Sequence, residues 1–176
     1  MAEFKAFTFG VEVNGETVLS IINGMESRRE EALDILKKNG ISDPRPGEWY
    51  PQQAWLDAFR EIAERFGDGC LYEIGKKIPE NAKFPPHIDS LEKALLSIDA
   101  AYHVNHRGGG IGSYKFEKTG GHSGVMVCKN PYPCSFDRGI IEALVRAFSP
   151  EASVRHDAGA PCRQHGADSC TYIIEW

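Results

Sequence analysis

Four of the five cysteines fall in the C-terminal third of the chain, as two pairs that each enclose a short turn. Cys128 and Cys134 flank a proline-rich turn, and Cys162 and Cys170 flank a polar turn. Thiols at both ends of two turns can meet around one metal ion when the turns lie side by side, and zinc suits such thiolate ligands. The pattern therefore constrains the fold, because the strands and helices around the two turns must bring their ends together.

A zinc site needs about four nitrogen or sulfur ligands. Cys134 is placed just before an expected helix, whose dipole would stabilise a thiolate and favour metal binding. The chain has no Cys-x-x-Cys pair, and His156 and His165 are alternative fourth ligands. Two other interpretations stay open: the thiols are inert, or a pair such as Cys162 and Cys170 oxidises to a disulfide and acts as a redox switch.

The length and charge of the chain exclude several classes of protein. Its 176 residues suit one domain, or one domain with an extension. The formal net charge is −5 and there is no basic run, so we expect no nucleic-acid partner. No apolar run of about 18 residues is present, so we expect no membrane span. The chain opens without a signal-peptide pattern, which predicts a cytoplasmic protein with reduced thiols.

The N-terminal part is expected to begin with a β-hairpin. Residues 4–13 and 16–22 are rich in β-formers, and Asn14-Gly15 between them is a strong hairpin signal. Residues 28–39 predict a helix that ends at a glycine. Residues 52–66 predict a second helix, because its large apolar side chains recur at helical spacing.

The helical pattern continues to about residue 106, and after the glycine run at 108–110 it changes to an alternating one. Asp89, with Glu92 as its capping-box partner, is the expected N-cap of a helix that ends near His106. We expect helical turns at 71–78, a helix at 89–106, strands at 111–118 and 122–129, a helix at 136–148, and strands at 153–157 and 171–176. This order predicts an α+β fold, in which helices cover an antiparallel sheet.

Histidines and aromatic residues mark a second candidate site. His103 and His106 are three residues apart and would share one face of a helix. They could form a polar cluster at the mouth of a pocket, bind haem or a metal, or only cap the end of the helix. His122 would join them if the two strands after the helix pair. Neither a nucleophile with a base nor paired carboxylates can be argued from spacing, so no catalytic residue is predicted.

The stretch from Cys162 to Trp176, with Cys134 and the helix after it, resembles the C-terminal signature of the 4-vinyl-reductase-type small-molecule-binding domain. The resemblance implies a ligand-binding domain at 71–176 and an N-terminal extension at 1–70, which together form one compact unit. Such domains often form homodimers, and they are similar to a wider fold group that includes haem-nitric-oxide-associated subunits.

The resemblance also implies site residues. In aromatic-sensing members of that family, three cysteines and a carboxylate hold a structural zinc ion, and Cys134, Cys162 and Cys170 match the three cysteines. The carboxylate would fall near Gly159, where this chain has none, so Cys128 is expected to replace it. The family's ligand pocket would draw on the helix that ends at His106 and on the strand that carries Tyr114 and Phe116.

These observations predict a sensor or carrier domain that binds a small hydrophobic, aromatic or tetrapyrrole ligand such as haem, with zinc in a structural role. Any output would pass to a downstream signalling protein, because no DNA-binding or ATPase segment is recognised. The alternatives are an enzyme or enzyme subunit in tetrapyrrole vinyl reduction, which lacks a recognisable nicotinamide or flavin motif here, and the cysteine-based redox switch.

Overall fold

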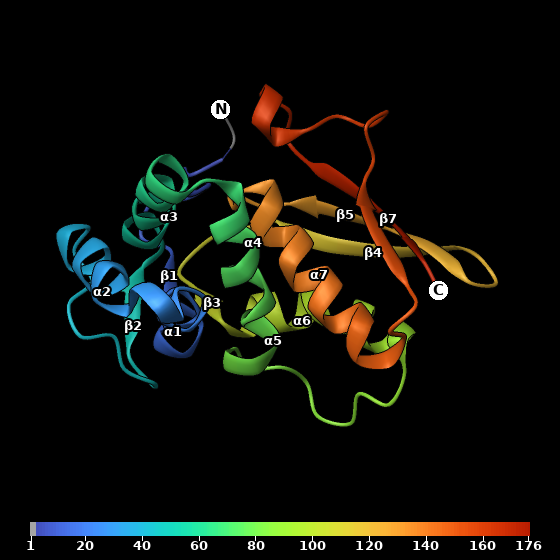
Figure 1. The fold of residues 1–176 in the computed structure, drawn as a ribbon, viewed down its shortest axis with the longest axis horizontal. Coiled ribbons are helices and arrows are strands. Elements are labelled where there is room, and N and C mark those ends of the chain that lie inside the picture. Colours follow the sequence, from blue (N-terminus) through green and yellow to red (C-terminus); the bar gives the residue numbers. More distant parts are fainter. Residues whose placement is uncertain (1–2) are drawn as a thin grey trace.

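The computed structural model describes residues 3–176 and contains two antiparallel sheets with helices packed around them (Figure 1). A three-stranded sheet has the order β2-β1-β3, and a four-stranded sheet has the order β4-β5-β7-β6. The predicted α+β class, with helices over an antiparallel sheet, is therefore confirmed. No helix within residues 3–176 is both long and apolar enough to cross a membrane.

The predicted N-terminal hairpin is wrong. Only β1 (Glu12–Asn14) is a strand, and the chain then enters helix α1 (Gly15–Gly24). Asn14 acts as the N-cap, since its side chain accepts a hydrogen bond from the backbone N–H of Thr17 at 3.0 Å. Val18, Ile21 and Ile22 recur at helical spacing and are buried, so the core selects a helix where β-formers and Asn-Gly suggested a turn.

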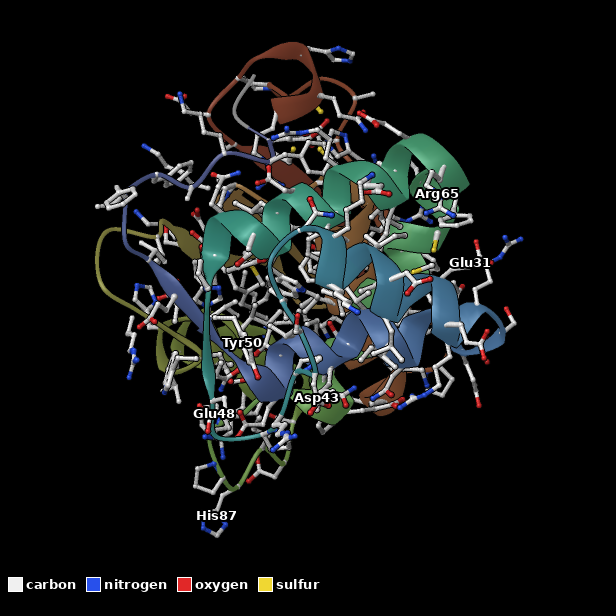
Figure 2. All side chains as sticks on the ribbon, turned by 90° about the vertical axis from the view of Figure 1, so that its left-hand side faces the viewer. Glu31, Asp43, Glu48, Tyr50, Arg65 and His87 are labelled. Carbon is white, nitrogen blue, oxygen red and sulfur yellow. The ribbon has the colours of Figure 1, made fainter. Side chains whose placement is uncertain are left out.

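Strand β1 pairs instead with two short strands from distant parts of the chain, β2 (Trp49–Pro51) and β3 (His106–Arg107). The helical predictions in this half are confirmed by α2 (Arg29–Lys38) and α3 (Gln52–Phe66), with η1 (Glu26–Arg28) before α2. Arg65 and Glu31 join the exposed sides of α3 and α2 at 3.2 Å (Figure 2). Exposed pairs of this kind contribute little to stability.

Four more helices build the rest of the core: α4 (Asp68–Lys76), α5 (Ile78–Asn81), α6 (Leu91–Val104) and α7 (Cys134–Phe148). Helix α6 is capped by Ser90, whose hydroxyl accepts from the backbone N–H of Lys93, and not by Asp89. Helices α4 and α7 pack closely through two glycines. A Cβ atom added at Gly75 would lie 2.2 Å from the carbonyl oxygen of Phe136, and one at Gly139 would lie 2.3 Å from that of Tyr72.

The four-stranded sheet contains β4 (Ser113–Gly120), β5 (Ser123–Lys129), β6 (Ser153–His156) and β7 (Cys170–Glu175), so all four predicted strands are present. Helices α6 and α7 pack against this sheet (Figure 1). The register places Cys128 of β5 opposite Tyr114 on one side and opposite Cys170 on the other.

One continuous cluster of buried apolar side chains runs through both halves of the chain. Trp55 and Phe59 of α3 meet Phe136 of α7 in this cluster, with ring centroids 5.9 and 4.8 Å away. The boundary predicted at residue 71 therefore runs through one shared core, and the division into two segments stays a prediction.

Candidate functional site

Four potential metal ligands converge near the end of the four-stranded sheet. Cys134 is the first residue of α7, His156 ends β6, Cys162 precedes the short helix η2 (Arg163–His165), and Cys170 begins β7. We call these four residues the Cys/His cluster. One ligand atom from each lies within 4.8 Å of all the others. The cluster therefore joins a helix and two strands at one point.

The sulfur atoms of the Cys/His cluster are already close together. Cys134 Sγ lies 2.8 Å from Cys170 Sγ and 3.5 Å from Cys162 Sγ, and the remaining sulfur pair is 3.8 Å apart. Sulfurs on a tetrahedral zinc ion, with bonds of about 2.3 Å, would lie about 3.8 Å apart. Two of the three separations are near that value. The third, between Cys134 and Cys170, is shorter than that value.

His156 supplies the observation that most favours a metal. Its Nε2 atom is buried and makes no hydrogen bond of ordinary geometry among the described residues, although the imidazole lies close enough to Cys170 to help lower the pKa of that thiol. The imidazole ring lies edge-on to Tyr172, with ring centroids 5.2 Å apart. A buried polar atom without a partner costs free energy, and such atoms are rare in native proteins. A metal ion bound among the sulfurs would give this nitrogen its missing partner.

The electrostatics of the Cys/His cluster favour a thiolate at Cys170. A hydrogen bond from Cys134, followed by the positive charge of Arg163, lowers the pKa of Cys170. The same hydrogen bond to Cys170, with burial, raises the pKa of Cys134. Glu3 also faces Cys134, because its Oε1 atom accepts from the backbone N–H at 3.0 Å and lies 3.1 Å from Sγ. Burial raises the pKa of this carboxyl group.

The cluster is accessible from outside. A surface cleft of about 880 Å³ lies beside it, lined by Cys134, His156 and Cys162 together with Tyr72, Arg138 and other polar residues. An entry path of this kind is required for a metal site that loads after folding.

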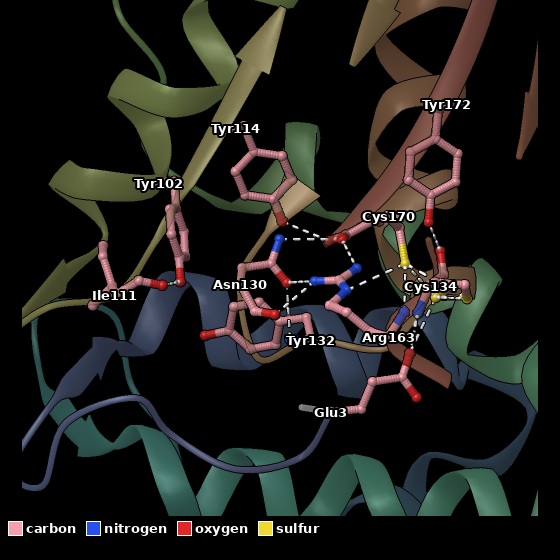
Figure 3. A network of polar contacts seen from close by, with 12 residues as sticks. Glu3, Tyr102, Ile111, Tyr114, Asn130, Tyr132, Cys134, Arg163, Cys170 and Tyr172 are labelled. Carbon is pink, nitrogen blue, oxygen red and sulfur yellow. Dashed lines mark hydrogen bonds and ion pairs between the residues drawn. The ribbon is translucent and has the colours of Figure 1, made fainter. Parts of the chain in front are cut away.

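A buried arginine connects the Cys/His cluster to the interior (Figure 3). The side chain of Arg163 has 0% exposure, and its Nε atom lies 3.3 Å from Cys170 Sγ. One terminal nitrogen donates to the carbonyl oxygen of Asn130 at 2.7 Å, and the other pairs with Asp137. Burial alone would lower the pKa of Arg163, but the charge of Asp137, together with Cys170, Cys128 and the hydrogen bond to Asp137, outweighs burial and the pKa is raised. The guanidinium therefore remains charged.

Asp137 extends this network to the sheet. One of its oxygens accepts a hydrogen bond from the hydroxyl of Tyr114 at 2.6 Å, and Asn130 donates to the other at 3.1 Å. Burial raises the pKa of the Asp137 carboxyl group, while the neighbouring Arg163 opposes that rise. A buried ion pair offsets its desolvation cost only when further hydrogen bonds satisfy its polar atoms. Here every nitrogen of the guanidinium and both oxygens of Asp137 have a partner.

A second candidate site is a small cavity, which we call the aromatic pocket. It measures about 40 Å³, and its walls come from α3, α6, β4 and the start of α7. Its principal lining residues are Trp55, Tyr102, His106, Tyr114, Tyr132 and Phe136. Two of the lining residues each carry a buried polar atom without a partner among residues 3–176, Oγ1 of Thr17 and Nε1 of Trp55. The surface of the pocket itself is almost wholly apolar.

His106 is fully engaged in this wall. Its Nδ1 atom lies 2.8 Å from the carbonyl oxygen of Tyr102, which can only accept, so Nδ1 carries the proton. Nε2 then accepts from the hydroxyl of Tyr132 at 2.5 Å, and that hydroxyl accepts from Gln52 at 2.8 Å. Burial lowers the pKa of His106 to about 4. The imidazole is therefore neutral at pH 7.

The structure separates the other residues predicted for a ligand site. Tyr114 lines the aromatic pocket with His106, whereas His103 is exposed and its Nδ1 lies 2.8 Å from the carbonyl oxygen of Asp99. Phe116 packs against Trp176, with ring centroids 6.4 Å apart. His122 lies on the exposed turn between β4 and β5. His103, Phe116 and His122 are therefore not brought to the pocket.

Cys128 lies outside the Cys/His cluster. Its side chain is buried in β5, where burial raises the pKa of the thiol well above its usual value. His156, one of the two histidines considered from the sequence, occupies the fourth position instead. Sequence reasoning missed Arg163, Tyr132 and Trp55 as site residues. Only Arg163 carried a signal, as the residue directly after a predicted ligand.

No sequence-family profile and no curated protein sequence matches the chain. Solved structures do match. An H-NOX protein from S. oneidensis in the Fe(II)NO ligation state has a TM-score of 0.65 and 13% identity, with 92% of this chain and 98% of that chain covered. A mutant of T. tengcongensis H-NOX gives 0.64 and 16%, with 90% and 94% covered. A third structure, described as "Modulating Heme Redox Potential Through Protein-Induced Porphyrin Distortion", gives 0.65 and 17%, with 93% and 99% covered.

These matches correct the resemblance to the 4-vinyl-reductase-type domain, which is wrong. That resemblance rested on the spacing of Cys134, Cys162 and Cys170 near the C-terminus, and such spacing reflects the demands of gathering thiols at the ends of strands and helices. The likeness to the H-NOX structures extends over nine-tenths of the chain and includes the N-terminal helices, whereas the earlier resemblance was weak before residue 71. At identities this low the likeness concerns architecture alone. The chain therefore has the H-NOX fold.

Proposed function

We propose that this chain is a sensor domain on the H-NOX fold, in which the Cys/His cluster holds one structural zinc ion and the aromatic pocket takes a small neutral ligand. The observation that carries the zinc proposal is the convergence of three sulfurs and one nitrogen of His156 within 4.8 Å, together with the buried Nε2 atom of that imidazole, which lacks an ordinary hydrogen-bond partner. The observation that carries the ligand proposal is the small, almost wholly apolar cavity, two of whose lining residues, Thr17 and Trp55, have a buried polar atom without a partner among residues 3–176.

The donor set favours zinc in particular. Three thiolates and one imidazole form a soft set of four, which matches the closed tetrahedral sites that zinc occupies in structural roles. The ligands come from α7, β6, β7 and the loop before η2, so the ion would tie together segments that are up to 36 residues apart. Metal binding would therefore contribute directly to the free energy of folding.

Haem is the ligand that the H-NOX neighbours suggest, since one of those structures is described as a study of haem redox potential. His106 is a buried imidazole at the pocket wall and would be the residue to bind iron. The pocket does not fit the group in this arrangement, however. Its volume is about 40 Å³, against roughly 300–1,000 Å³ for ordinary cofactor sites. Both nitrogens of His106 are hydrogen-bonded, and no lysine or arginine of residues 3–176 lines the pocket to pair with haem propionates.

The size of the pocket limits the ligand we propose. A cavity that binds benzene measures about 150 Å³, so one of about 40 Å³ admits only a few heavy atoms without movement of its walls. The neutral His106 and the uncharged wall disfavour an ion. Thr17 offers a hydroxyl and Trp55 an N–H donor, so a ligand with one hydrogen-bond acceptor is the best match.

A redox switch is a second candidate, favoured by the sulfur separations of 2.8 to 3.8 Å in the Cys/His cluster. If the metal were lost, two of these thiols could be oxidised to a disulfide by an external two-electron oxidant such as a peroxide, which would take up the two electrons and two protons released. The enzymatic alternative rested on the 4-vinyl-reductase resemblance and is not retained. A reducing, cytoplasmic setting is part of the proposal, because zinc–thiolate sites need reduced cysteines. The homodimer and a downstream signalling partner stay predictions.

Metal analysis and an absorption spectrum of the protein as purified test the proposal. We expect about one zinc per chain, lost in His156→Ala and in Cys162→Ser. Cys70→Ser is the matched control, because Cys70 is a partly buried thiol of α4 outside the cluster and should leave the zinc content unchanged. Zinc-free protein with a native fold would contradict the structural role. A strong haem band after addition of hemin, lost in His106→Ala, would overturn the assignment of a small neutral ligand.

A further inference from the structure

Arg163 occupies an unusual position between the two candidate sites. It is the only arginine among residues 3–176 whose side chain is fully buried. Burial of a guanidinium costs much free energy unless its partners compensate for the lost water. The partners of Arg163 must therefore interact with it strongly. Those partners lie on opposite sides: the Cys/His cluster on one side and the wall of the aromatic pocket on the other (Figure 3).

On the side of the cluster, Arg163 touches Cys170 twice. The backbone N–H and the side-chain Nε–H both point at Sγ, at 3.4 and 3.3 Å. Two N–H groups aimed at one sulfur stabilise a thiolate more than a thiol, because charge-assisted hydrogen bonds are the stronger kind. The guanidinium thus orients and stabilises one of the four proposed zinc ligands.

On the side of the pocket, the same guanidinium holds Asp137, and Asp137 holds Tyr114. The hydroxyl of Tyr114 donates to Asp137 at 2.6 Å, and its ring lines the aromatic pocket. The path from Cys170 to the pocket wall therefore passes through only Arg163 and Asp137, whose side chains are both completely buried. Every step in it is a hydrogen bond or an ion pair.

We propose that Arg163 is a positioning residue that couples the Cys/His cluster to the aromatic pocket, by sharing its charge between Cys170 and Asp137. The proposal rests on the zinc site proposed above. The metal-free cluster with a thiolate at Cys170, and a zinc ion with three thiolates and a neutral imidazole, both carry one net negative charge. Zinc would displace the proton of Cys134, which is donated to Cys170 Sγ, and would leave the two N–H groups of Arg163 as hydrogen-bond donors to that sulfur. Occupation of the cluster would therefore draw the guanidinium toward Cys170, weaken its hold on Asp137 and change the hydrogen bond that fixes Tyr114. By linkage, a ligand that moves Tyr114 would change zinc affinity by the same factor.

Charge sharing predicts effects of opposite sign for the two partners. Arg163→Met removes the cation beside Cys170, and we expect zinc affinity to fall at least tenfold, as is usual when a group that orients a metal ligand is lost. Asp137→Asn removes the competitor but keeps the shape of the side chain, so the guanidinium faces the cluster alone and zinc affinity should rise. The double variant Arg163→Met/Asp137→Asn removes both charges and should bind zinc more weakly than the wild type.

The affinities would be measured by competition with a chromophoric zinc chelator at one fixed pH, on variants that show native circular dichroism. A merely structural role for the pair predicts that every variant loses affinity through a weakened fold. Equal affinities, or a loss in Asp137→Asn as large as in Arg163→Met, would overturn the proposal. If Arg163→Met does not fold, two variants still give the sign of the change in zinc affinity. These are Asp137→Asn and the double variant, in which neither member of the ion pair is left charged without the other.

A spectroscopic readout follows the coupling into the pocket. Protein labelled with 3-fluorotyrosine would be titrated with zinc, and the fluorine resonance of Tyr114 identified by its loss in Tyr114→Phe. We expect zinc to shift this resonance in the wild type and to leave it in place in the double variant. Tyr172 is the internal control, because its hydroxyl donates to the carbonyl oxygen of Cys134 at 2.6 Å and should respond to zinc in both proteins.

The outcomes separate this proposal from the one it rests on. If no protein binds zinc at the Cys/His cluster, the proposed function fails, and the tyrosine spectra remain unchanged everywhere, Tyr172 included. If zinc binds and shifts Tyr172 while Tyr114 does not respond in the wild type, the zinc site stands and the coupling through Arg163 is refuted. A shift of Tyr114 that persists in the double variant would also refute it.

Discussion

Replacement of His106 by asparagine should remove a specific part of the pH dependence of stability. Asparagine can still donate to the carbonyl oxygen of Tyr102, but it does not titrate. In the wild type, burial lowers the pKa of His106 to about 4, from an unfolded value of 6.5. The folded protein therefore holds the imidazole neutral in a pH range where the unfolded chain binds a proton.

The sign and size of the effect follow from that difference. Above pH 6.5 both states are neutral at this residue, so its contribution to stability is complete. Between pH 6.5 and about 4 the unfolded state binds one more proton, and the free energy of unfolding falls by about 1.4 kcal/mol for each pH unit. Across the whole range His106 should remove about 3 kcal/mol of stability.

Urea unfolding of the wild type and of His106→Asn, measured between pH 4.5 and 8, isolates this effect. The carboxylates titrate in both proteins, so the difference between their unfolding free energies reports on His106. We expect the difference to be constant above pH 7 and to shrink steadily below pH 6. Tyr132→Phe is the matched control, since it removes the hydrogen bond to Nε2 and keeps the titrating group; its difference from the wild type should vary little with pH. A pH-independent difference for His106→Asn would refute the reasoning.

Three further changes test the packing and the sites. Cys128→Ala should leave the zinc content unchanged and cost about 1 kcal/mol of stability for lost packing, measured by urea unfolding; loss of zinc would place Cys128 among the ligands. Gly139→Ala should destabilise the protein by about 2 kcal/mol or more, because the added Cβ would lie 2.3 Å from the carbonyl oxygen of Tyr72; an unchanged thermal midpoint would contradict the close contact of α4 with α7. Thr17→Val should raise the midpoint of ligand-free protein, because it removes a buried hydroxyl without a partner; a lowered midpoint would show that the hydroxyl is already satisfied.

Local patterns predicted the elements whose apolar spacing was long and regular. Helix α3 was found with its observed bounds because Trp55, Phe59 and Ile62 repeat over several turns and all face the core. The strands of the C-terminal sheet were found because buried and partly buried residues alternate along β5 and β7. Periodicity of this kind depends on neighbours in sequence, so it can be read without the fold.

The prediction of an N-terminal hairpin was wrong because the Asn14-Gly15 dipeptide is compatible with two structures. Asn14 before Gly15 can form a tight turn or can cap a helix, and the choice depends on what the following residues bury. Here Val18 and Ile21 meet the core on one face, and Gly15 lies against the carbonyl group of Arg45, where a Cβ atom would come within 1.8 Å of the oxygen. These contacts come from segments far away in sequence, and local propensity cannot supply them.

For a similar reason, the sequence predicted the three cysteines of the Cys/His cluster but not its fourth member. Cys134, Cys162 and Cys170 stand at the ends of elements, and spacing alone suggested that they meet. The fourth position depends on the register of β6 against β7, which pairs His156 with Tyr172 and so places the imidazole beside the sulfurs. Cys128 offers the same kind of ligand atom, but its position within β5 keeps its thiol outside the Cys/His cluster. The position of Arg163 directly after Cys162 hinted at a role near the cluster, but its burial could not be predicted, because arginine in a polar loop is ordinarily exposed.

X-ray absorption at the zinc edge, on the protein as purified, tests the central claim most directly. The Cys/His cluster predicts one zinc per chain, with three sulfur neighbours at about 2.3 Å and one nitrogen neighbour at about 2.0 Å. The nitrogen is expected to disappear from the spectrum of any His156→Ala protein that retains zinc. Four sulfur neighbours would instead assign Cys128 to the site, and the absence of zinc from correctly folded protein would contradict the account.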